Sequence, residues 1–219
     1  MGVDLHCKEN RLEDAEKMLI VIFKEGLVVP SVVTYTALID GYCKRGKIDT
    51  ALGVVELMEK NGCQLNAWTY NVLIYGFCQE RKVHKAMALL SKMLKSRLSP
   101  DLVTYTSLIQ GQCKVGQIDS AFRLLDLMEA NGLVPDQQTY AILLDGLCKH
   151  REIEDAYSFF NELVKKGITA NEVMYTVLID GLCKAEKIDI ARSLLEKMMS
   201  GGCLLDRLLH LYCFDRLLL

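Results

Sequence analysis

Residues 32–49 read VVTYTALIDGYCKRGKID, and residues 102–119 read LVTYTSLIQGQCKVGQID. The tyrosine in this stretch recurs every 35 residues, at Tyr35, Tyr70, Tyr105, Tyr140 and Tyr175. A glycine recurs in register with it, at Gly41, Gly76, Gly111, Gly146 and Gly181. Internal repetition with a period of about 20–50 residues is typical of solenoids, in which each repeat buries its apolar face against its neighbours. The sequence therefore predicts five consecutive units over residues 32–206.

Each unit contains two stretches with helical periodicity. In the first unit, apolar residues at 35, 38, 39, 42 and 43 follow the spacing of one helix face, and a second such face runs from Ile48 to Met58. A turn is expected at Gly46, although the same position is Arg81 in the next unit, so glycine is preferred there rather than required. Gly62 is placed as a C-cap glycine after the second helix. The pattern predicts an all-α fold, an α-solenoid of helix-turn-helix repeats.

Three columns of small residues indicate how these helices pack. A glycine inside a helix lowers stability by about 0.5–1 kcal/mol relative to alanine, so its recurrence predicts close helix approach. The second helices repeat an alanine, at Ala51, Ala86, Ala121, Ala156 and Ala191. Five of the nine cysteines are in register, at Cys43, Cys78, Cys113, Cys148 and Cys183, and are expected to be small core residues. The chain has no CxxC pair, so no metal site is expected, and no other cofactor is expected either. Its cysteine count is odd, so no disulfide framework is expected.

The composition is that of a globular protein, with 51% hydrophobic and 25% charged residues. A net charge of −2 argues against a protein that binds polyanions through a general basic excess. No apolar run reaches the roughly 18–20 residues that span a bilayer, so no membrane partner is expected. The N-terminal residues carry acids and no continuous apolar segment, so no targeting segment is visible.

The unit from Val32 to Asp49 closely resembles a pentatricopeptide repeat, as do the stretches that begin at Leu102 and Glu172 (EVMYTVLIDGLCKAEKID). The Pro-Asp pair that closes a unit at Pro100-Asp101 is equally typical of this family. The constant 35-residue spacing resembles the P class, as in plant organellar and fertility-restorer-like members. The resemblance implies a right-handed superhelix. The expected parts are a partial repeat (1–31), five repeats (32–66, 67–101, 102–136, 137–171, 172–206) and a divergent tail (207–219).

The resemblance implies binding of single-stranded RNA, with one base read per repeat by two or three side chains. In this family a reader residue directly after each Tyr acts with the last residue of the unit, here called the cap residue. The pairs are Thr36 with Asn66, Asn71 with Asp101, Thr106 with Asp136, Ala141 with Asn171, and Thr176 with Asp206. By the family's pairing, Thr–Asn favours A, Asn–Asp favours U and Thr–Asp favours G. The expected target is therefore 5′-A-U-G-N-G-3′, with the base at Ala141 undetermined.

The two members of each pair have different alternative explanations. The cap residues lie two or three positions ahead of an expected helix start, where Asp and Asn are favoured N-caps, so a purely structural role explains them. The reader residues lie in the first helical turn beside a buried Tyr, where packing alone does not demand short polar side chains. The reader residues are therefore the stronger indication of base recognition.

Two further columns fit RNA binding. In the family, the residues two positions before each Tyr sandwich the base; this stacking column is Val33, Trp68, Val103, Gln138 and Val173. Stacking contributes about 1–3 kcal/mol per base, although Trp68 is equally explained as an ordinary half-buried aromatic residue. A lysine row closes the first helices, at Lys44, Lys114, Lys149 and Lys184, with Gln79 as the exception. These lysines are placed either to track phosphates or to interact with helix C-termini.

No catalytic constellation is visible, because the four histidines occupy unrelated repeat positions and no nucleotide-binding or deaminase signature occurs. The leading hypothesis is a monomeric, non-enzymatic solenoid in a mitochondrion or plastid. It would bind single-stranded RNA and support RNA processing, stability or translation, with other RNA-processing proteins as further partners. One alternative is a protein-binding tetratricopeptide-like scaffold, although its period is 34 residues. Another is a truncated fragment without independent function, because the repeat pattern fails after Asp206.

Overall fold

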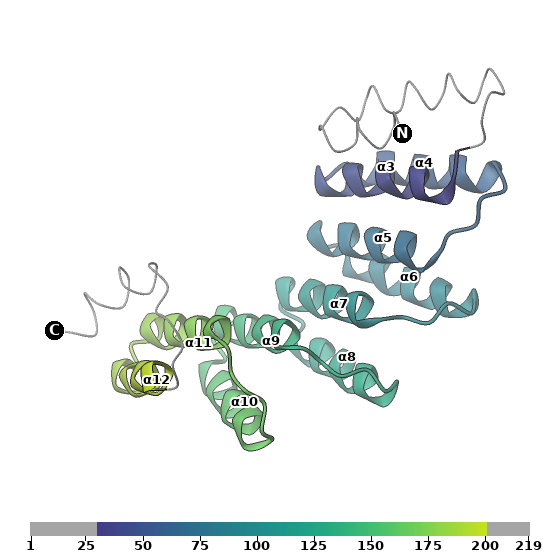
Figure 1. Cartoon of the computed structure of the whole chain (residues 1–219). Helices are drawn as coiled ribbons and strands as arrows, with labels where there is room; N and C mark the ends of the chain where they lie inside the picture. The colour runs from purple at the N-terminus through teal and green to yellow at the C-terminus, as the bar shows by residue number, and fades with distance from the viewer. Residues whose placement is uncertain (1–29, 201–219) are drawn as a thin grey trace. The chain divides into compact units, whose positions relative to one another are not determined.

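The computed structural model describes residues 30–200, which form ten helices of 13 residues and no strand. In chain order they are α3 (Val32–Lys44), α4 (Ile48–Lys60), α5 (Ala67–Gln79), α6 (Val83–Lys95), α7 (Leu102–Lys114), α8 (Ile118–Ala130), α9 (Gln137–Lys149), α10 (Ile153–Lys165), α11 (Glu172–Lys184) and α12 (Ile188–Ser200) (Figure 1). Odd-numbered labels mark the first helix of each repeat. This confirms an all-α helical-repeat solenoid. Asp206, the tail and nearly all of the partial first repeat lie outside the described residues.

The turn inside each repeat is closed by one residue in the left-handed region. Gly46 has φ 69° and Gly116 has φ 80°, a conformation that glycine adopts without steric cost. Arg81, Arg151 and Glu186 take the same place with φ between 59° and 66°. Glycine is therefore preferred but not required at this turn, as the sequence predicted. Gly62 follows the second helix with φ 71°, which confirms the C-cap glycine.

The core is built from the residue columns of the sequence. All five alanines of the second helices are fully buried, and Tyr35, Leu38, Ile39, Tyr42 and Cys43 are at most 4% exposed. The predicted apolar face of the first helix is therefore correct. Fully burying a large apolar side chain contributes about 1.5–3 kcal/mol, so the buried tyrosine, leucine and isoleucine columns add substantially to the favourable free energy of folding.

The glycine and cysteine columns meet each other between consecutive repeats. A Cβ atom added at Gly76 would lie 2.7 Å from Cys43 Sγ, and one at Gly146 would lie 2.7 Å from Cys113 Sγ. Gly111 and Gly181 meet Cys78 and Cys148 in the same way. The first helices of neighbouring repeats therefore approach each other at a Gly–Cys contact that has no room for a further methyl group.

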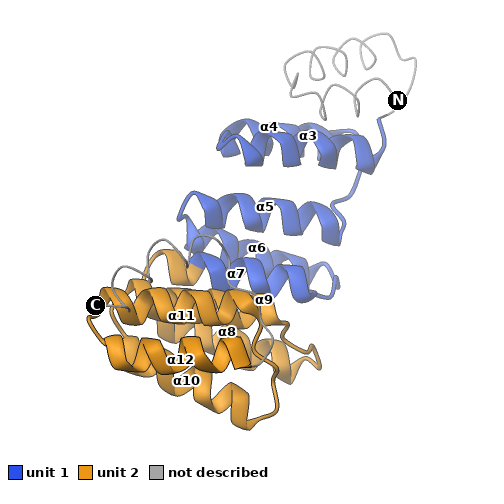
Figure 2. Cartoon of the chain, turned by 60° about the vertical axis from the view of Figure 1, so that its left-hand side comes forward, with its two compact units in different colours: residues 1–111 blue, residues 112–219 orange. Residues whose placement is uncertain are grey.

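The chain divides into two compact units, residues 1–111 and 112–219, with the boundary inside α7 (Figure 2). In the first unit, α3 packs against α4 and α5, and α5 packs against α6. In the second unit, α9 packs against α8, α10 and α11, and α11 packs against α12. Within each unit, first helices of successive repeats thus lie side by side and present equivalent residues next to each other. None of the helices between residues 30 and 200 has the length and apolarity to cross a membrane.

Candidate nucleic-acid interface

The stacking column lies on the surface of the first helices. Its members are the second residue of each helix, and the apolar ones are unusually accessible: Val33 is 53% exposed, Trp68 50%, Val103 57% and Val173 55%. Gln138 is exposed as well. Apolar side chains that recur at one helix position and stay in water are available to a ligand. Trp68 is therefore an accessible aromatic surface and not a core residue.

The four cap residues that the structure describes are confirmed as N-caps: Asn66, Asp101, Asp136 and Asn171. Each of these four directly precedes its helix, closer than the two or three residues expected, because the first helices begin one turn earlier than the apolar pattern indicates. The side chains of Asn66, Asp136 and Asn171 accept a hydrogen bond from the backbone N–H three residues later, at 2.9, 2.8 and 3.0 Å. Asp101 Oδ1 accepts from Thr104 N at 2.9 Å in the same way.

In the second repeat, the structure brings the reader and the cap residue into direct contact. Asn71 Nδ2 donates to both carboxylate oxygens of Asp101, at 3.0 and 3.1 Å. Asn71 is only 7% exposed, whereas Asp101 is exposed. The pair therefore forms one polar unit, with the carboxylate at the surface and the amide beneath it.

In the first repeat, the two residues are connected through a third. Thr36 Oγ1 lies 2.8 Å from Thr69 Oγ1, and Thr69 Oγ1 lies 2.9 Å from Asn66 Oδ1. Thr36 is fully buried and its hydroxyl also donates to Val32 O at 2.8 Å. Asn66 is the exposed member of this pair, so a ligand reaches Asn66 first.

In the fourth repeat, four predicted site residues line one hollow between α9 and α11. The hollow has a volume of about 480 Å³. Its walls include the stacking residues Gln138 and Val173, the reader Ala141 and the cap residue Asn171. Ala141 is 5% exposed and offers no hydrogen bond, so Asn171 and the neighbouring Asp145 supply polar groups there. The sequence assigned these residues to a base-reading pair and to a stacking column, and the structure places members of both around a single space.

In the third and fifth repeats, the reader and the cap residue are not described within one unit. Thr106 and Asp136 belong to different compact units. Thr176 is half-buried, and its Oγ1 atom has no hydrogen-bond partner among the described residues. Its expected cap residue, Asp206, lies outside them.

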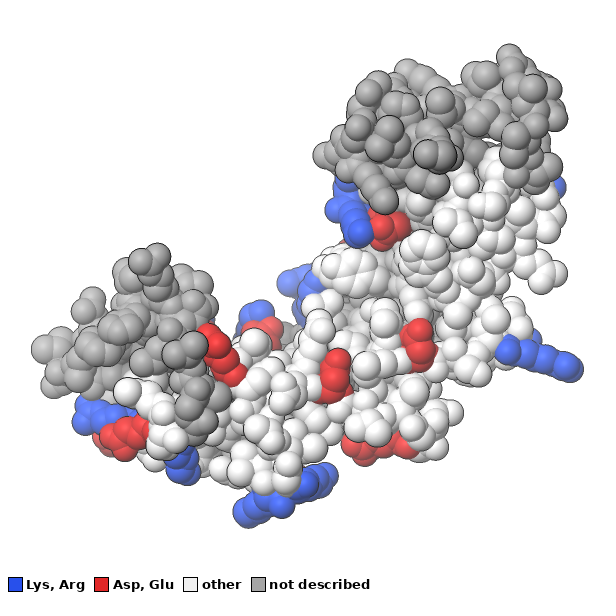
Figure 3. Space-filling view, in the orientation of Figure 1, with Lys and Arg blue, Asp and Glu red and all other residues white. Residues whose placement is uncertain are grey.

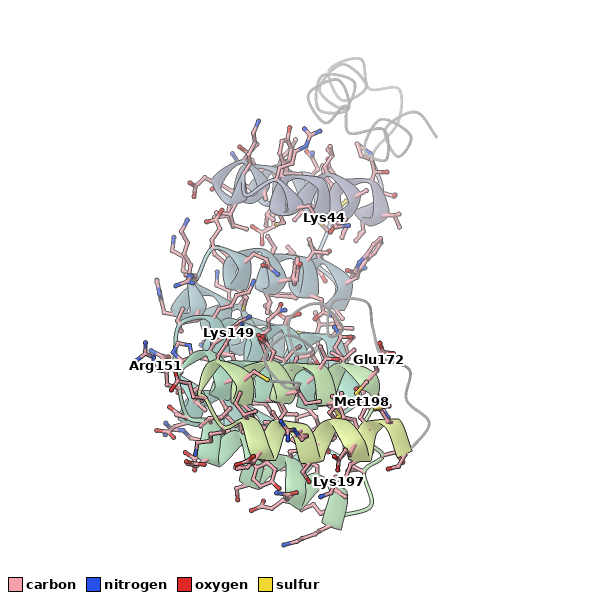
Figure 4. All side chains as sticks on the ribbon, turned by 90° about the vertical axis from the view of Figure 1, so that its left-hand side faces the viewer. Lys44, Lys149, Arg151, Glu172, Lys197 and Met198 are labelled. Atoms are coloured by element: carbon pink, nitrogen blue, oxygen red, sulfur yellow. The ribbon has the colours of Figure 1, made fainter. Side chains whose placement is uncertain are left out.

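The lysine row closes the first helices, as predicted, but three of its members are paired with acids. Lys44, Lys149 and Lys184 each lie 2.6 Å from the carboxylate four residues earlier, on Asp40, Asp145 and Asp180. Lys44 and Lys149, which are labelled in Figure 4, are the last residues of α3 and α9. On the face in Figure 3, the described basic side chains are scattered and several lie beside acidic ones. The first helices therefore carry alternating charge on this row and not a continuous positive stripe.

The column cysteines are structural. Burial raises the pKa of Cys43, Cys113 and Cys148 to about 12, with nearby carboxylates as a smaller cause. These thiols therefore stay protonated and are poor nucleophiles and poor metal ligands at neutral pH. Within residues 30–200, no three His, Cys, Asp or Glu side chains are grouped so that they could hold a metal ion.

Sequence reasoning missed the threonines that connect the readers to the caps. A threonine directly before the column tyrosine recurs at Thr34, Thr69, Thr104 and Thr139, and becomes Met174 in the fifth repeat. Its recurrence was visible in the sequence. Its contacts were not, because Thr69 and Thr104 reach reader residues that are 33 positions earlier in the chain.

The repeats also match a known family model. The PPR repeat family model matches residues 30–79, 69–114, 100–149 and 142–184, and a PPR repeat model matches residues 173–203. The chain belongs to the pentatricopeptide repeat (PPR) family. None of the curated proteins compared with this PPR chain matches it.

Solved PPR structures share the fold of this PPR chain. The crystal structure of PPR10 from maize is 25% identical, with a TM-score of 0.78 over 90% of this chain and 28% of that chain. PPR10 in complex with an 18-nt psaJ RNA element is 24% identical, with a TM-score of 0.79 over 98% of this chain and 30% of that chain. The PPR domain of Arabidopsis thaliana protein-only RNase P 1 in complex with tRNA is 20% identical, with a TM-score of 0.62 over 77% of this chain and 89% of that domain. The chain thus spans less than a third of the maize protein.

Proposed function

We propose that this chain binds single-stranded RNA along its first helices and reads one base per repeat through its reader and cap residues. The hollow of the fourth repeat carries the proposal. Two stacking residues, a reader and a cap residue line one space of about 480 Å³, within the roughly 300–1,000 Å³ typical of ligand sites. A base in this space would lie between Gln138 and Val173 with its edge toward Ala141 and Asn171.

The exposed stacking column supports the same function. Bases stack on apolar or aromatic side chains, and this contact tolerates any base because each has a π-face. Selectivity then has to come from the reader and cap residues, whose polar groups can meet base edges. The PPR10 and RNase P structures in complex with RNA support this choice of ligand, because both share the fold.

The proposed target is 5′-A-U-G-N-G-3′. Four defined letters recur by chance about once in 256 nucleotides, so a transcript-specific role requires more repeats than these five. We therefore propose that these repeats work together with further repeats of the P class. The location that we propose is a mitochondrion or plastid. There it would occupy or remodel a transcript as a monomer, without catalysing a reaction, and support RNA processing, stability or translation together with other processing proteins.

The test is RNA binding by the chain, measured with the AUGNG oligomer, a scrambled oligomer and poly-C. We expect tighter binding to AUGNG. Equal affinity for all three, or binding to none, would overturn base reading.

A matched pair of variants tests where on the chain the RNA binds. Val173→Glu places a negative charge in the hollow, whereas Val134→Glu makes the same change at an 81% exposed valine outside the first helices. We expect the first to weaken RNA binding and the second to leave it nearly unchanged. Equal effects of the two variants would place the RNA elsewhere.

A further inference from the structure

A column of fully buried threonines has no part in the function described so far. Thr69, Thr104 and Thr139 are the third residues of α5, α7 and α9, and each is 0% exposed. Burying a hydroxyl is unfavourable unless it is hydrogen-bonded. The hydrogen-bond partners of these threonine hydroxyls therefore indicate the role of the column.

Thr104 connects three polar groups at the junction between the second and third repeats. Its Oγ1 accepts from Asp101 N at 3.1 Å and lies 2.9 Å from Asp101 Oδ1. The same atom lies 2.5 Å from Oδ1 of Asn71, the reader of the preceding repeat. Asn71 Nδ2 donates to the carboxylate of Asp101, so the three side chains form a closed triangle of polar contacts. The hydroxyl of Thr104 has a single proton, and Asn71 Oδ1 is the nearer of its two acceptors.

This triangle fixes the orientation of the Asn71 amide. A carboxylate can only accept hydrogen bonds, so the amide nitrogen has to face Asp101. The amide oxygen then faces the Thr104 hydroxyl, which can donate to it. Rotating the amide by 180° would place its oxygen against the carboxylate. A base that approaches Asn71 therefore meets a fixed arrangement of donor and acceptor.

The junctions after the first and the fourth repeat fit the same relation between the threonine column and the reader of the preceding repeat. Thr69 lies between the reader Thr36 and the cap residue Asn66, at 2.8 and 2.9 Å. In the fourth repeat the reader is Ala141, which has no polar group to orient, and the corresponding residue of the next repeat is Met174. In the first, second and fourth repeats, the hydroxyl is thus present where the reader is polar and absent where the reader is apolar.

We infer that Thr69 and Thr104 are positioning residues that orient the reader of the preceding repeat and so sharpen its choice of base. This inference rests on the proposed RNA binding. The base preference of one repeat then depends on three residues, the third of which belongs to the first helix of the next repeat.

The test is the base preference at the second letter of the target, measured with four RNA oligomers that differ only there. Thr104→Val keeps the shape of the side chain and removes the hydroxyl, whereas Thr104→Ser keeps the hydroxyl. We expect Thr104→Val to reduce the preference for U roughly three- to tenfold, with the other letters unchanged, and Thr104→Ser to retain it. Thr69→Val is the matched control, because the same change should act on the first letter only.

Two RNA-binding results would overturn the inference. One is an unchanged second-letter preference in Thr104→Val while the unmodified chain discriminates. The other is an equal loss of affinity for all four oligomers, which indicates a purely structural role for the hydroxyl.

A second measurement does not depend on RNA. In the free chain, NMR of the Asn71 side-chain amide should show a more mobile group with faster proton exchange in Thr104→Val than in Thr104→Ser. An equally ordered amide in both variants would overturn the positioning role. Failure of the unmodified chain to prefer any base would instead overturn the proposed function, and the amide measurement would still decide whether Thr104 positions Asn71.

Discussion

The Gly–Cys contact between neighbouring first helices can be tested with a single methyl group. In Gly76→Ala the new Cβ on α5 would lie 2.7 Å from Cys43 Sγ, 2.9 Å from Ile48 Cδ1 and 3.0 Å from Cys43 Cβ. The sulfur could rotate away, but Cys43 Cβ is fixed to the α3 backbone. The methyl group therefore acts as a wedge between α3 and α5.

The expected change in the free energy of unfolding follows from two opposing effects. Overpacking a buried contact destabilises by about 1–3 kcal/mol. Replacing glycine by alanine within a helix stabilises by about 0.5–1 kcal/mol, because the unfolded chain loses conformational freedom. The free energy of unfolding should therefore fall in Gly76→Ala, by up to about 2.5 kcal/mol. Gly53 provides the matched control, because it lies inside α4 with no atom within 4 Å of an added Cβ. Gly53→Ala should raise stability by about 0.5–1 kcal/mol.

The assay is urea unfolding followed by far-UV circular dichroism, with the midpoints of the three proteins compared. Repeat arrays can unfold in more than one step, so the first transition is the one to compare. The Cys43→Ala background removes the sulfur and should reduce the penalty at Gly76 by a measurable coupling energy. A Gly76→Ala chain that is stabilised as much as Gly53→Ala would refute the close helix approach.

Four further outcomes are expected. Trp68→Ala should weaken binding of the matched RNA about 5- to 150-fold, because the indole stacks on a base in the proposed complex, and Trp68→Phe should weaken it less. Equal binding by the unmodified chain and both variants in an RNA titration would contradict this. Thr106→Asn should move the third-letter preference from G towards U, which oligomers that differ at that letter would reveal, and an unchanged preference would reject the assignment. The contribution of the buried thiols to stability should be constant below about pH 9 and fall between pH 9 and 12, since the unfolded state loses thiol protons that the folded state keeps on Cys43, Cys113 and Cys148, whose pKa is about 12. Cys113→Ala should lower this slope in urea unfolding at several pH values by up to about 1.4 kcal/mol per pH unit, and an unchanged slope would argue against the shift. The slope of log affinity against log salt should be no steeper than about −3, because the lysine row has four members, and a steeper slope would indicate phosphate contacts elsewhere.

The sequence was sufficient to predict the helical hairpins because each column has a local physical reason. The buried Ala51 and its equivalents, and the left-handed turn at Gly46, follow from periodicity and steric rules that involve only nearby residues. The N-caps were predictable for the same reason, since Asn66 bonds a residue three positions later. The ion pair of Asp40 and Lys44 was equally predictable from the sequence, because residues four apart on a helix are neighbours.

The links between repeats were not predictable from the sequence. The hydrogen bond of Thr104 to Asn71 joins residues 33 positions apart and depends on how α5 and α7 stack. The hollow at Ala141 depends in the same way on the separation of α9 and α11. Periodicity shows which residues recur, but it does not show the offset at which a residue of one repeat meets the next.

The charge pairing on the first helices has a consequence for selectivity. A net charge of −2 allows a local basic stripe in principle, since it describes only the whole molecule. The structure places an aspartate beside Lys44, Lys149 and Lys184, so most of the lysine row is locally neutralised. Phosphate attraction supplies most of the non-specific binding of a typical nucleic-acid-binding protein. A surface with little net charge reduces this contribution for every sequence and leaves base stacking and edge contacts unaffected. Under the proposed function, the paired lysines would therefore raise the ratio of specific to non-specific RNA binding, which is the quantity that matters for a base-reading protein.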